Sequence, residues 1–221
     1  MHVLDHVFVL CSEGAPEAEA LTEFGLREGA GNTHPGQGTA CRRFFFGNAY
    51  LELLWVHDAA EARSPVSLPT RLFERWATRG AGASPFGMVL RSSGPAPAEP
   101  PFPSWPYHPS YLPPELAIDV AVGTLMSEPE IFYFRPPRRP EDLASQSTAH
   151  AVALGEVAAV TIGVPGSSQR TAALRAVQEL GLASFPDAMD HGLVLDFGPG
   201  PPGPRETTVD LRPRLPLVLR F

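Results

Sequence analysis

The sequence has no lysine, and all 17 of its basic residues are arginine. A Schiff-base lysine and the lysine of a phosphate-binding loop are therefore both excluded. Coding bias in a GC-rich genome explains the absence most simply. Positive charge is also scarce, because the formal net charge is −7 and the pI is about 5.5. This balance disfavours nucleic acid as a partner.

Long apolar runs and cysteines are few as well. No apolar run reaches the roughly 18 residues that a membrane helix needs, and the N-terminus lacks the basic-then-apolar order of a signal peptide. Two cysteines, Cys11 and Cys41, cannot form a disulfide framework and favour a reducing compartment. We therefore expect a cytoplasmic protein without a membrane partner. Its 221 residues, 43% of them hydrophobic, suffice for one sizeable domain or two small fused modules.

The first quarter of the chain, residues 4–56, reads as strand, helix, strand and strand. The first of these strands contains His6 and the last contains Glu52, although both strands are otherwise apolar. Side chains alternate between the two faces of a strand, and a buried, unpaired carboxylate is unfavourable enough to need a cation, a metal or a hydrogen-bond network. The pattern predicts that His6 and Glu52 lie on the floor of a cup. The opposite apolar face, around Leu51, needs a covering helix.

The last third of the chain repeats this pattern. Residues 160–164 read as a strand, and residues 169–180 read as a helix with one apolar side. That helix ends in Glu179-Leu180-Gly181-Leu182, which echoes Glu23-Phe24-Gly25-Leu26 at the end of the first helix. Neither half of such a repeat can bury its sheet face alone. We therefore expect a second module with its strand and helix placed as in the first.

A proline-dense stretch, residues 94–114, lies between the two patterns. It carries Trp105, Tyr107 and Tyr111, which are more aromatic residues than a stiff linker needs. Two interpretations remain open: an aromatic lid that keeps water from the cup, or plugs for an open sheet edge. We expect the three aromatic side chains to be largely buried, with at least one lining the same cavity as Glu52.

Seven motifs carry a resemblance to a known superfamily. They are Leu4-Asp5-His6-Val7, Thr33 to Ala40, Arg42 to Gly47, Tyr50-Leu51-Glu52-Leu53, Ser84 to Gly87, Trp105-Pro106-Tyr107 and Tyr111-Leu112-Pro113. Together they resemble the vicinal oxygen chelate superfamily, which includes glyoxalases, extradiol dioxygenases and bleomycin-resistance proteins. The glyoxalase-like branch is the closer match. The resemblance is good in the first module, patchy in the middle and one of pattern only in the C-terminal third.

The resemblance implies an α+β protein built from two βαβββ modules whose curved sheets surround a cavity. Residues 1–92 would form the first module and residues 151–221 the second. Residues 93–150 would form a proline- and aromatic-rich insert with extra strands.

Members of this superfamily that use a metal draw ligands from both modules, and His6 and Glu52 match the ligands of one module. The resemblance therefore implies that these two residues hold a divalent metal (Zn, Fe, Mn or Ni) or act as catalytic acid and base. The matching positions of the second half are Ile162 and the neighbourhood of Leu217, or Met88 in an alternative alignment, and none of these is a ligand. The other interpretation is a site without a cofactor.

Two ligands are too few for a tight metal site, so another histidine would have to join them. The candidates are His34, His108, His150 and His191. Without such a residue, His6 and Glu52 would form a buried, hydrogen-bonded pair in a metal-free pocket.

Further residues are candidates for binding the substrate. Cys41 is a nucleophile only if its pKa is lowered, and it is otherwise a small apolar filler. Arg43 shares a strand face with Phe45 and is a candidate to pair with Glu52 or to hold an anionic substrate. The full set of expected binding residues is His34, Gln37, Thr39, Cys41, Arg43, Trp105, Tyr107 and Tyr111.

Two functions follow from these expectations. The first is a glyoxalase-like enzyme, a lyase, isomerase or dioxygenase, that acts on a small oxygenated molecule and in which an apolar setting raises the pKa of Glu52. The second is a binding protein that sequesters a small hydrophobic compound, as resistance proteins of this fold do. In both cases the partner is a small molecule, and a homodimer is left open.

Overall fold

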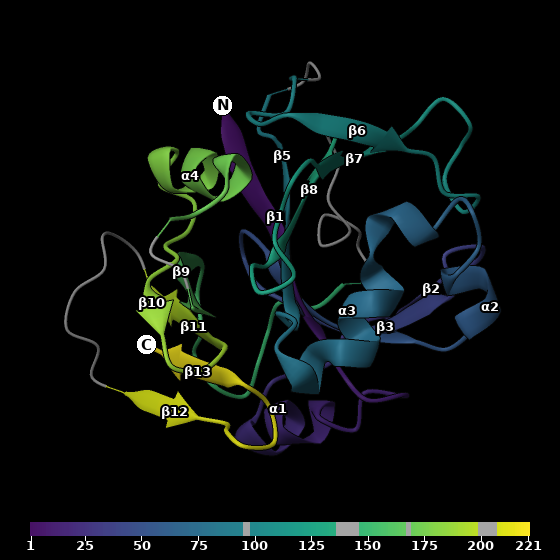
Figure 1. Cartoon of the computed structure of the whole chain (residues 1–221). Helices are drawn as coiled ribbons and strands as arrows, with labels where there is room; N and C mark the ends of the chain where they lie inside the picture. Colours follow the sequence, from purple (N-terminus) through teal and green to yellow (C-terminus); the bar gives the residue numbers. More distant parts are fainter. Residues whose placement is uncertain (95–97, 136–145, 167–168, 199–206) are drawn as a thin grey trace.

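The computed structural model describes residues 1–94, 98–135, 146–166, 169–198 and 207–221. The fold is α+β, with one eight-stranded sheet and one five-stranded sheet (Figure 1). The predicted class, with two sheet modules, is confirmed. None of the helices in the described residues is long and apolar enough to span a membrane.

The eight-stranded sheet has the order β2-β3-β4-β1-β5-β8-β7-β6. Its strands are β1 (His2–Leu10), β2 (Asn32–His34), β3 (Thr39–Phe45), β4 (Tyr50–Val56), β5 (Phe86–Ser92), β6 (Ser104–Tyr107), β7 (Ile118–Ala121) and β8 (Glu130–Phe134). Strands β1 and β5 pair antiparallel at the centre, β1 runs parallel to β4, and β5 runs parallel to β8. The two halves of the sheet therefore have the same layout. Residues 93–150 supply β6, β7 and β8, so the expected extra strands complete this sheet.

The five-stranded sheet has the order β10-β9-β11-β13-β12. Its elements are β9 (Val157–Pro165), α4 (Ala172–Glu179), β10 (Asp187–Ala188), β11 (Gly192–Phe197), β12 (Thr208–Asp210) and β13 (Leu217–Arg220). Its central pair β9–β11 is antiparallel, while β10 runs parallel to β9 and β13 runs parallel to β11. This is the pattern of five consecutive strands of the larger sheet, β4-β1-β5-β8-β7. The limits of the domains remain a prediction.

The predicted repeat is visible in how each first strand leads into its helix. Helix α1 (Ala18–Phe24) follows β1, and α4 follows β9. Each helix ends at a glycine with positive φ, 108° at Gly25 and 69° at Gly181. The glycine amide bonds a carbonyl three residues back, and the next amide, of Leu26 or Leu182, bonds one five residues back. This paired arrangement ends a helix with a left-handed residue, which glycine adopts without steric strain.

Replacing Gly181 with alanine should lower the free energy of unfolding by about 1 kcal/mol, because an L-residue is strained at this φ. A Cβ atom there would meet no atom within 4 Å, so the loss reports backbone strain rather than a clash. Urea denaturation measures the effect. Gly80→Ala is the control, since Gly80 also has open space but no positive φ; an equal loss in both variants would contradict the explanation.

The two sheets share one continuous hydrophobic core. Leu51 of β4, Met88 of β5, Ile162 of β9 and Leu217 of β13 all lie in it and are buried. The apolar back of the larger sheet was expected to need a helix. Residues of the second sheet and of α1 lie in the shared core against that face and provide cover for it. Figure 1 shows β9 to β13 on one side of β1 and β5, with α2 (Ala59–Ala62) and α3 (Leu72–Thr78) on the other.

Helix α3 closes the other face of the larger sheet. Leu72 packs into the same apolar cluster as Phe8 and Val89. Arg75 of α3 is fully buried and pairs with Glu130 of β8, with 2.9 Å between Nη2 and Oε2. The helix is therefore pinned to the sheet, and its Leu72 lines a cup that both halves of the sheet help to form.

Candidate functional site

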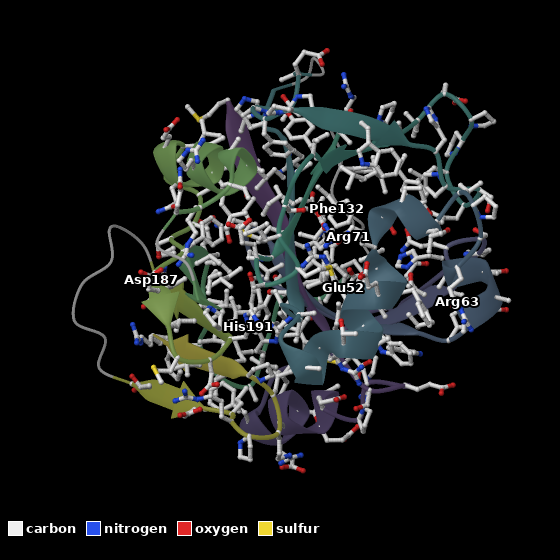
Figure 2. The ribbon with its side chains drawn as sticks, viewed as in Figure 1. Glu52, Arg63, Arg71, Phe132, Asp187 and His191 are labelled. Atoms are coloured by element: carbon white, nitrogen blue, oxygen red, sulfur yellow. The ribbon has the colours of Figure 1, made fainter. Side chains whose placement is uncertain are left out.

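The cup contains a cavity of about 300 Å³, a volume suited to a small molecule. Its floor holds charged side chains, and its walls are mainly aromatic and aliphatic. Figure 2 labels Glu52 and Phe132, which line this cavity from opposite halves of the sheet. A larger cleft of about 490 Å³, which His191 lines, lies between the two sheets. We place the site in the smaller cavity because its polar groups converge on one point.

Three charged residues form the floor. Nδ1 of His6 lies 2.8 Å from Oδ1 of Asp5, and Nε2 of His6 lies 3.5 Å from Oε2 of Glu52. The His6 ring stacks on Tyr50, with 4.2 Å between ring centroids. The predicted placement of His6 and Glu52 in one cavity is therefore observed, while their catalytic roles remain predictions.

Asp5 is the functional candidate that sequence analysis missed. Neighbours in a regular strand face opposite sides, so a residue beside His6 should point away from the cavity. The pairing of β1 with β5 shifts register between Leu4 and His6. This bulge allows Asp5 and His6 both to line the cavity. Asp5 also pairs with Arg91, with 3.2 Å between Oδ2 and Nε.

At neutral pH the Asp5–His6–Glu52 array has the His6 imidazolium between the two carboxyl groups. Burial alone would lower the pKa of His6, but the hydrogen bonds and charges of Asp5 and Glu52 outweigh it and raise the pKa to about 9. Burial would raise the pKa of Glu52, yet the nearby His6 lowers it to about 2. The expectation of a raised Glu52 pKa is therefore wrong, because the apolar setting also contains the histidine cation.

The loop after β2 builds one wall. Nδ1 of His34 lies 2.9 Å from the Thr39 hydroxyl, which also accepts a 2.7 Å hydrogen bond from the Gln37 amide. The Tyr111 hydroxyl donates to Gln37 Oε1 at 3.2 Å. Burial lowers the pKa of His34, so its imidazole is neutral at physiological pH. These four residues, all expected at the site, form one connected network.

Cys41 lies beside this wall and is 3% exposed. Burial, and the charge of Glu52 beside it, raise the pKa of its thiol far above the ordinary value. The thiol is therefore a poor nucleophile, as sequence analysis favoured. A ring nitrogen of His34, Sγ of Cys41 and a carboxylate oxygen of Glu52 all lie within 4.8 Å of one another.

Arg43 lines the cavity and sits directly across from Glu52 in the β3–β4 pairing. Its guanidinium donates to the carbonyls of Ala30 and Gly31 and lies 5.2 Å from the Phe45 ring centroid. Within the described part of the chain no ion pair joins Arg43 to Glu52. Its expected role in holding an anionic substrate remains a prediction.

The three aromatic residues of the proline-dense stretch do not all lie at the cavity. Tyr107, which is buried, and Tyr111 line the cavity. Trp105 is only partly buried and is absent from the cavity lining, although it was expected there. It contacts Tyr107 edge to face and packs on the apolar cluster beneath. Strand β6 lies at the edge of the sheet, far from the charged floor on β1 and β4. Tyr107 lines the cavity, whereas Trp105, two residues earlier in the same strand, does not.

Comparison with known proteins identifies the family of the N-terminal part of the chain. The family model of the glyoxalase-like domain matches residues 4–109, a range that includes the entire charged floor. The chain carries a glyoxalase-like domain. No curated protein matches the sequence.

Two solved structures resemble the whole chain or a part of it. A hypothetical protein from Staphylococcus aureus aligns with a TM-score of 0.52 and 8% identity, over 100% of this chain and 98% of that one. A hypothetical protein from Bacillus halodurans aligns with a TM-score of 0.39 and 10% identity, over 63% of this chain and 98% of that one. At such low identity, the first shows only that the fold is shared.

The two-sided metal set of the superfamily does not fit the glyoxalase-like domain of this chain. In the pairing of β1 with β5, the residue opposite His6 is Val89. The cavity face of β8 carries Phe132 and Phe134. Met88, considered as a second ligand position, belongs to the core between the sheets. Both ring nitrogens of His6 face carboxylates, and among the described residues β5 and β8 contribute only Val89, Phe132 and Phe134 to the cavity lining, none of which binds a metal.

Of the four histidines considered as extra ligands, only His34 lines the cavity. His150 contacts the Phe45 carbonyl and accepts a hydrogen bond from the Arg27 amide. His191 lies at the larger cleft, beside the smaller sheet (Figure 2). His108 is exposed and is not part of the cavity lining.

Proposed function

We propose that the glyoxalase-like domain binds a small oxygenated molecule in its cup and moves a proton on it. The observation that carries this proposal is the Asp5–His6–Glu52 array on the floor of an otherwise apolar cavity. Burial strengthens electrostatic interactions, and titratable groups that burial and neighbours perturb together are typical of functional sites.

The proton transfer that the array supports is abstraction beside a carbonyl. A substrate oxygen that accepts a hydrogen bond from His6 would separate His6 from Glu52. Glu52 would then lose the partner that lowers its pKa and become a stronger base. The proton of the adjacent C–H would pass to Glu52, and the electron pair would move to the substrate oxygen, which the imidazolium stabilises.

The walls favour a compact, partly apolar substrate. Tyr107, Phe132 and Phe134 line the cavity away from the floor, and they limit the water that reaches Glu52. Arg43, also in the lining, provides a cation for a carboxylate or phosphate of the substrate.

Solvent exchange tests this proposal without knowledge of the complete reaction. Incubation in D2O with a panel of small 2-oxo and 2-hydroxycarbonyl compounds, with a chelator present, should replace the C–H protons beside the carbonyl of at least one compound. Glu52→Gln should slow that exchange by roughly 100-fold or more, the usual contribution of a general base. Proton NMR follows both exchange and binding.

The control is Glu74→Gln, which removes an exposed carboxylate of α3 and should leave the rate unchanged. Exchange that persists in Glu52→Gln would rule out Glu52 as the base. Ligand-induced shifts without exchange in the wild type would favour the second candidate function, a sequestering protein. The observation in favour of that candidate is that His6 and Glu52 pair with each other, with 3.5 Å between Nε2 and Oε2, which leaves neither group poised for chemistry.

We also propose a small molecule as the partner and the cytoplasm as the location, with neither nucleic acid nor membrane bound. Both cysteines are free and buried, and the net charge is −7; these features support the proposal. A homodimer remains a proposal for sedimentation analysis to test.

A further inference from the structure

We propose that His34, Cys41 and Glu52 form a site for a zinc-type divalent cation in one half of the cup. Their ligand atoms lie within 4.8 Å of one another. Ligands of a tetrahedral zinc ion, at roughly 2.0–2.3 Å from the metal, lie roughly 3.3–3.8 Å apart. Small side-chain rotations therefore bring the three donors onto one ion. All three side chains are buried, with exposures of 9%, 3% and 6%.

The chemistry of the three donors selects the type of metal. Imidazole nitrogen, thiolate sulfur and carboxylate oxygen together suit zinc, whereas calcium and magnesium prefer oxygen donors alone. Three protein ligands leave one position of a tetrahedral ion open. His34 and Glu52 line the cavity, so that position would face the ligand space.

The backbone holds the three residues in place before any metal arrives. His34 lies in β2, Cys41 in β3 and Glu52 in β4, which are consecutive, hydrogen-bonded strands of the sheet. A site built on paired strands keeps its donors closer to the required geometry than one built on loops. It also differs from the two-sided arrangement that the resemblance implied, because it needs nothing from β5 or β8.

A second layer of contacts orients the histidine. Nδ1 of His34 faces the Thr39 hydroxyl, which Gln37 holds through its amide. When Nδ1 carries the proton and donates to Thr39, Nε2 presents a lone pair. Histidines that bind metals commonly have such a partner on the other nitrogen, and loss of the partner typically weakens affinity by about 10–100-fold.

Glu52 can serve this site while it keeps its contact with His6. One carboxylate oxygen, Oε2, faces His6 Nε2. The Cys41 sulfur also lies within 4.8 Å of a carboxylate oxygen of Glu52. Binding of the ion would displace the thiol proton to solvent, and the sulfur and a carboxylate oxygen would then share the cation instead.

Cobalt titration of the reduced, full-length protein tests the site without any substrate. Co²⁺ bound through a thiolate gives a charge-transfer absorption band that imidazole and carboxylate ligands do not produce. The wild type should show this band with one equivalent of Co²⁺, and Zn²⁺ should displace it. Cys41→Ser should abolish the band. Thr39→Val should weaken Zn²⁺ binding by about 10–100-fold in competition with a chromogenic chelator.

Cys11→Ser is the matched control, because Cys11 is the other buried free cysteine, and it should keep the band and the zinc affinity. Circular dichroism establishes that each variant is folded. Absence of the band in folded wild type overturns the proposal, as does its survival in Cys41→Ser. Zinc binding that His6→Ala abolishes but His34→Ala leaves intact would instead place the ion at the two-sided position. None of these outcomes bears on the deuterium-exchange test, which is performed with a chelator.

Discussion

Replacing Arg75 with methionine is expected to lower the free energy of unfolding by about 3–5 kcal/mol, the range for removing one partner of a buried ion pair. The side chains of Arg75 and Glu130 are 0% and 2% exposed, so neither charge is hydrated when its partner is absent. Arg75 also donates to the carbonyls of Leu125, Met126 and Glu128. One side chain therefore holds α3, the start of β8 and the loop between β7 and β8 together. Chemical denaturation of the purified protein measures the loss.

A double variant separates the two causes of this loss. Arg75→Met with Glu130→Met removes the uncompensated carboxylate, so part of the stability should return, while the three carbonyls remain without their donor. Equal stability of the single and double variants would show that the carbonyl contacts, rather than the buried charge, dominate. Arg212→Met is the control, because its pair with Asp210 is exposed and its loss should change little.

The second large effect concerns the pH dependence of stability. The pKa of His6 is raised from 6.5 to about 9 in the folded protein, so protonated His6 stabilises the fold. This contribution is complete below the unfolded pKa of 6.5 and is lost as the pH rises through about 9. The wild type should lose on the order of 3 kcal/mol across this interval. His6→Gln should remove the decline below about pH 8, because glutamine does not titrate and the buried cysteines contribute only near and above the unfolded cysteine pKa of about 8.5.

The part of this interval below about pH 8 isolates His6 best, because it lies below the ordinary cysteine pKa of about 8.5. There is no lysine to titrate, and the other histidines with shifted pKa values have lowered ones, so they act below pH 6.5. Burial raises the pKa of Cys11 and of Cys41, so these thiols add to the decline only as the pH passes the unfolded cysteine pKa. Urea denaturation across the interval, with a chelator present, gives the measurement. His108→Gln, at an exposed position, should keep the wild-type decline. A decline in His6→Gln as steep as in the wild type would show that another group is responsible.

Glu52 has the opposite dependence. Its pKa is lowered from 4.5 to about 2 by His6, so its contribution is complete above pH 4.5 and is lost as the pH falls through about 2. The two contributions describe one shared interaction and do not add. Together they place the greatest stability of the pair between pH 4.5 and pH 6.5.

Sequence patterns predicted what depends on near neighbours in the chain. Alternation along β1 and β4 placed His6 and Glu52 on the same side of the sheet, because side-chain direction in a strand has a period of two. The echo around Gly25 and Gly181 predicted two equivalent helix ends, since the left-handed residue that ends each helix favours glycine. These signals require only local backbone geometry.

Pairings between distant segments were harder to predict. The expected partner of the first module was the C-terminal third. Yet β5 to β8 complete the sheet, and β9 to β13 cover its back. Several apolar strands of this chain have similar patterns, so the sequence does not show which of them pairs with β1. That choice depends on which strand pairs best along β1 and which is best buried in the shared core.

By itself, the sequence determined the α+β class, the glyoxalase-like first module and the parity that brings His6 and Glu52 to one cavity. Only the tertiary structure decided the composition of the site. A single bulge brought Asp5 to the floor, and the pairing of β2, β3 and β4 gathered His34, Cys41 and Glu52. The ion pair with His6 reversed the expected direction of the Glu52 pKa shift. The physical reason is that charge interactions and ligand geometry depend on distances of a few ångströms in space, which sequence separation does not encode.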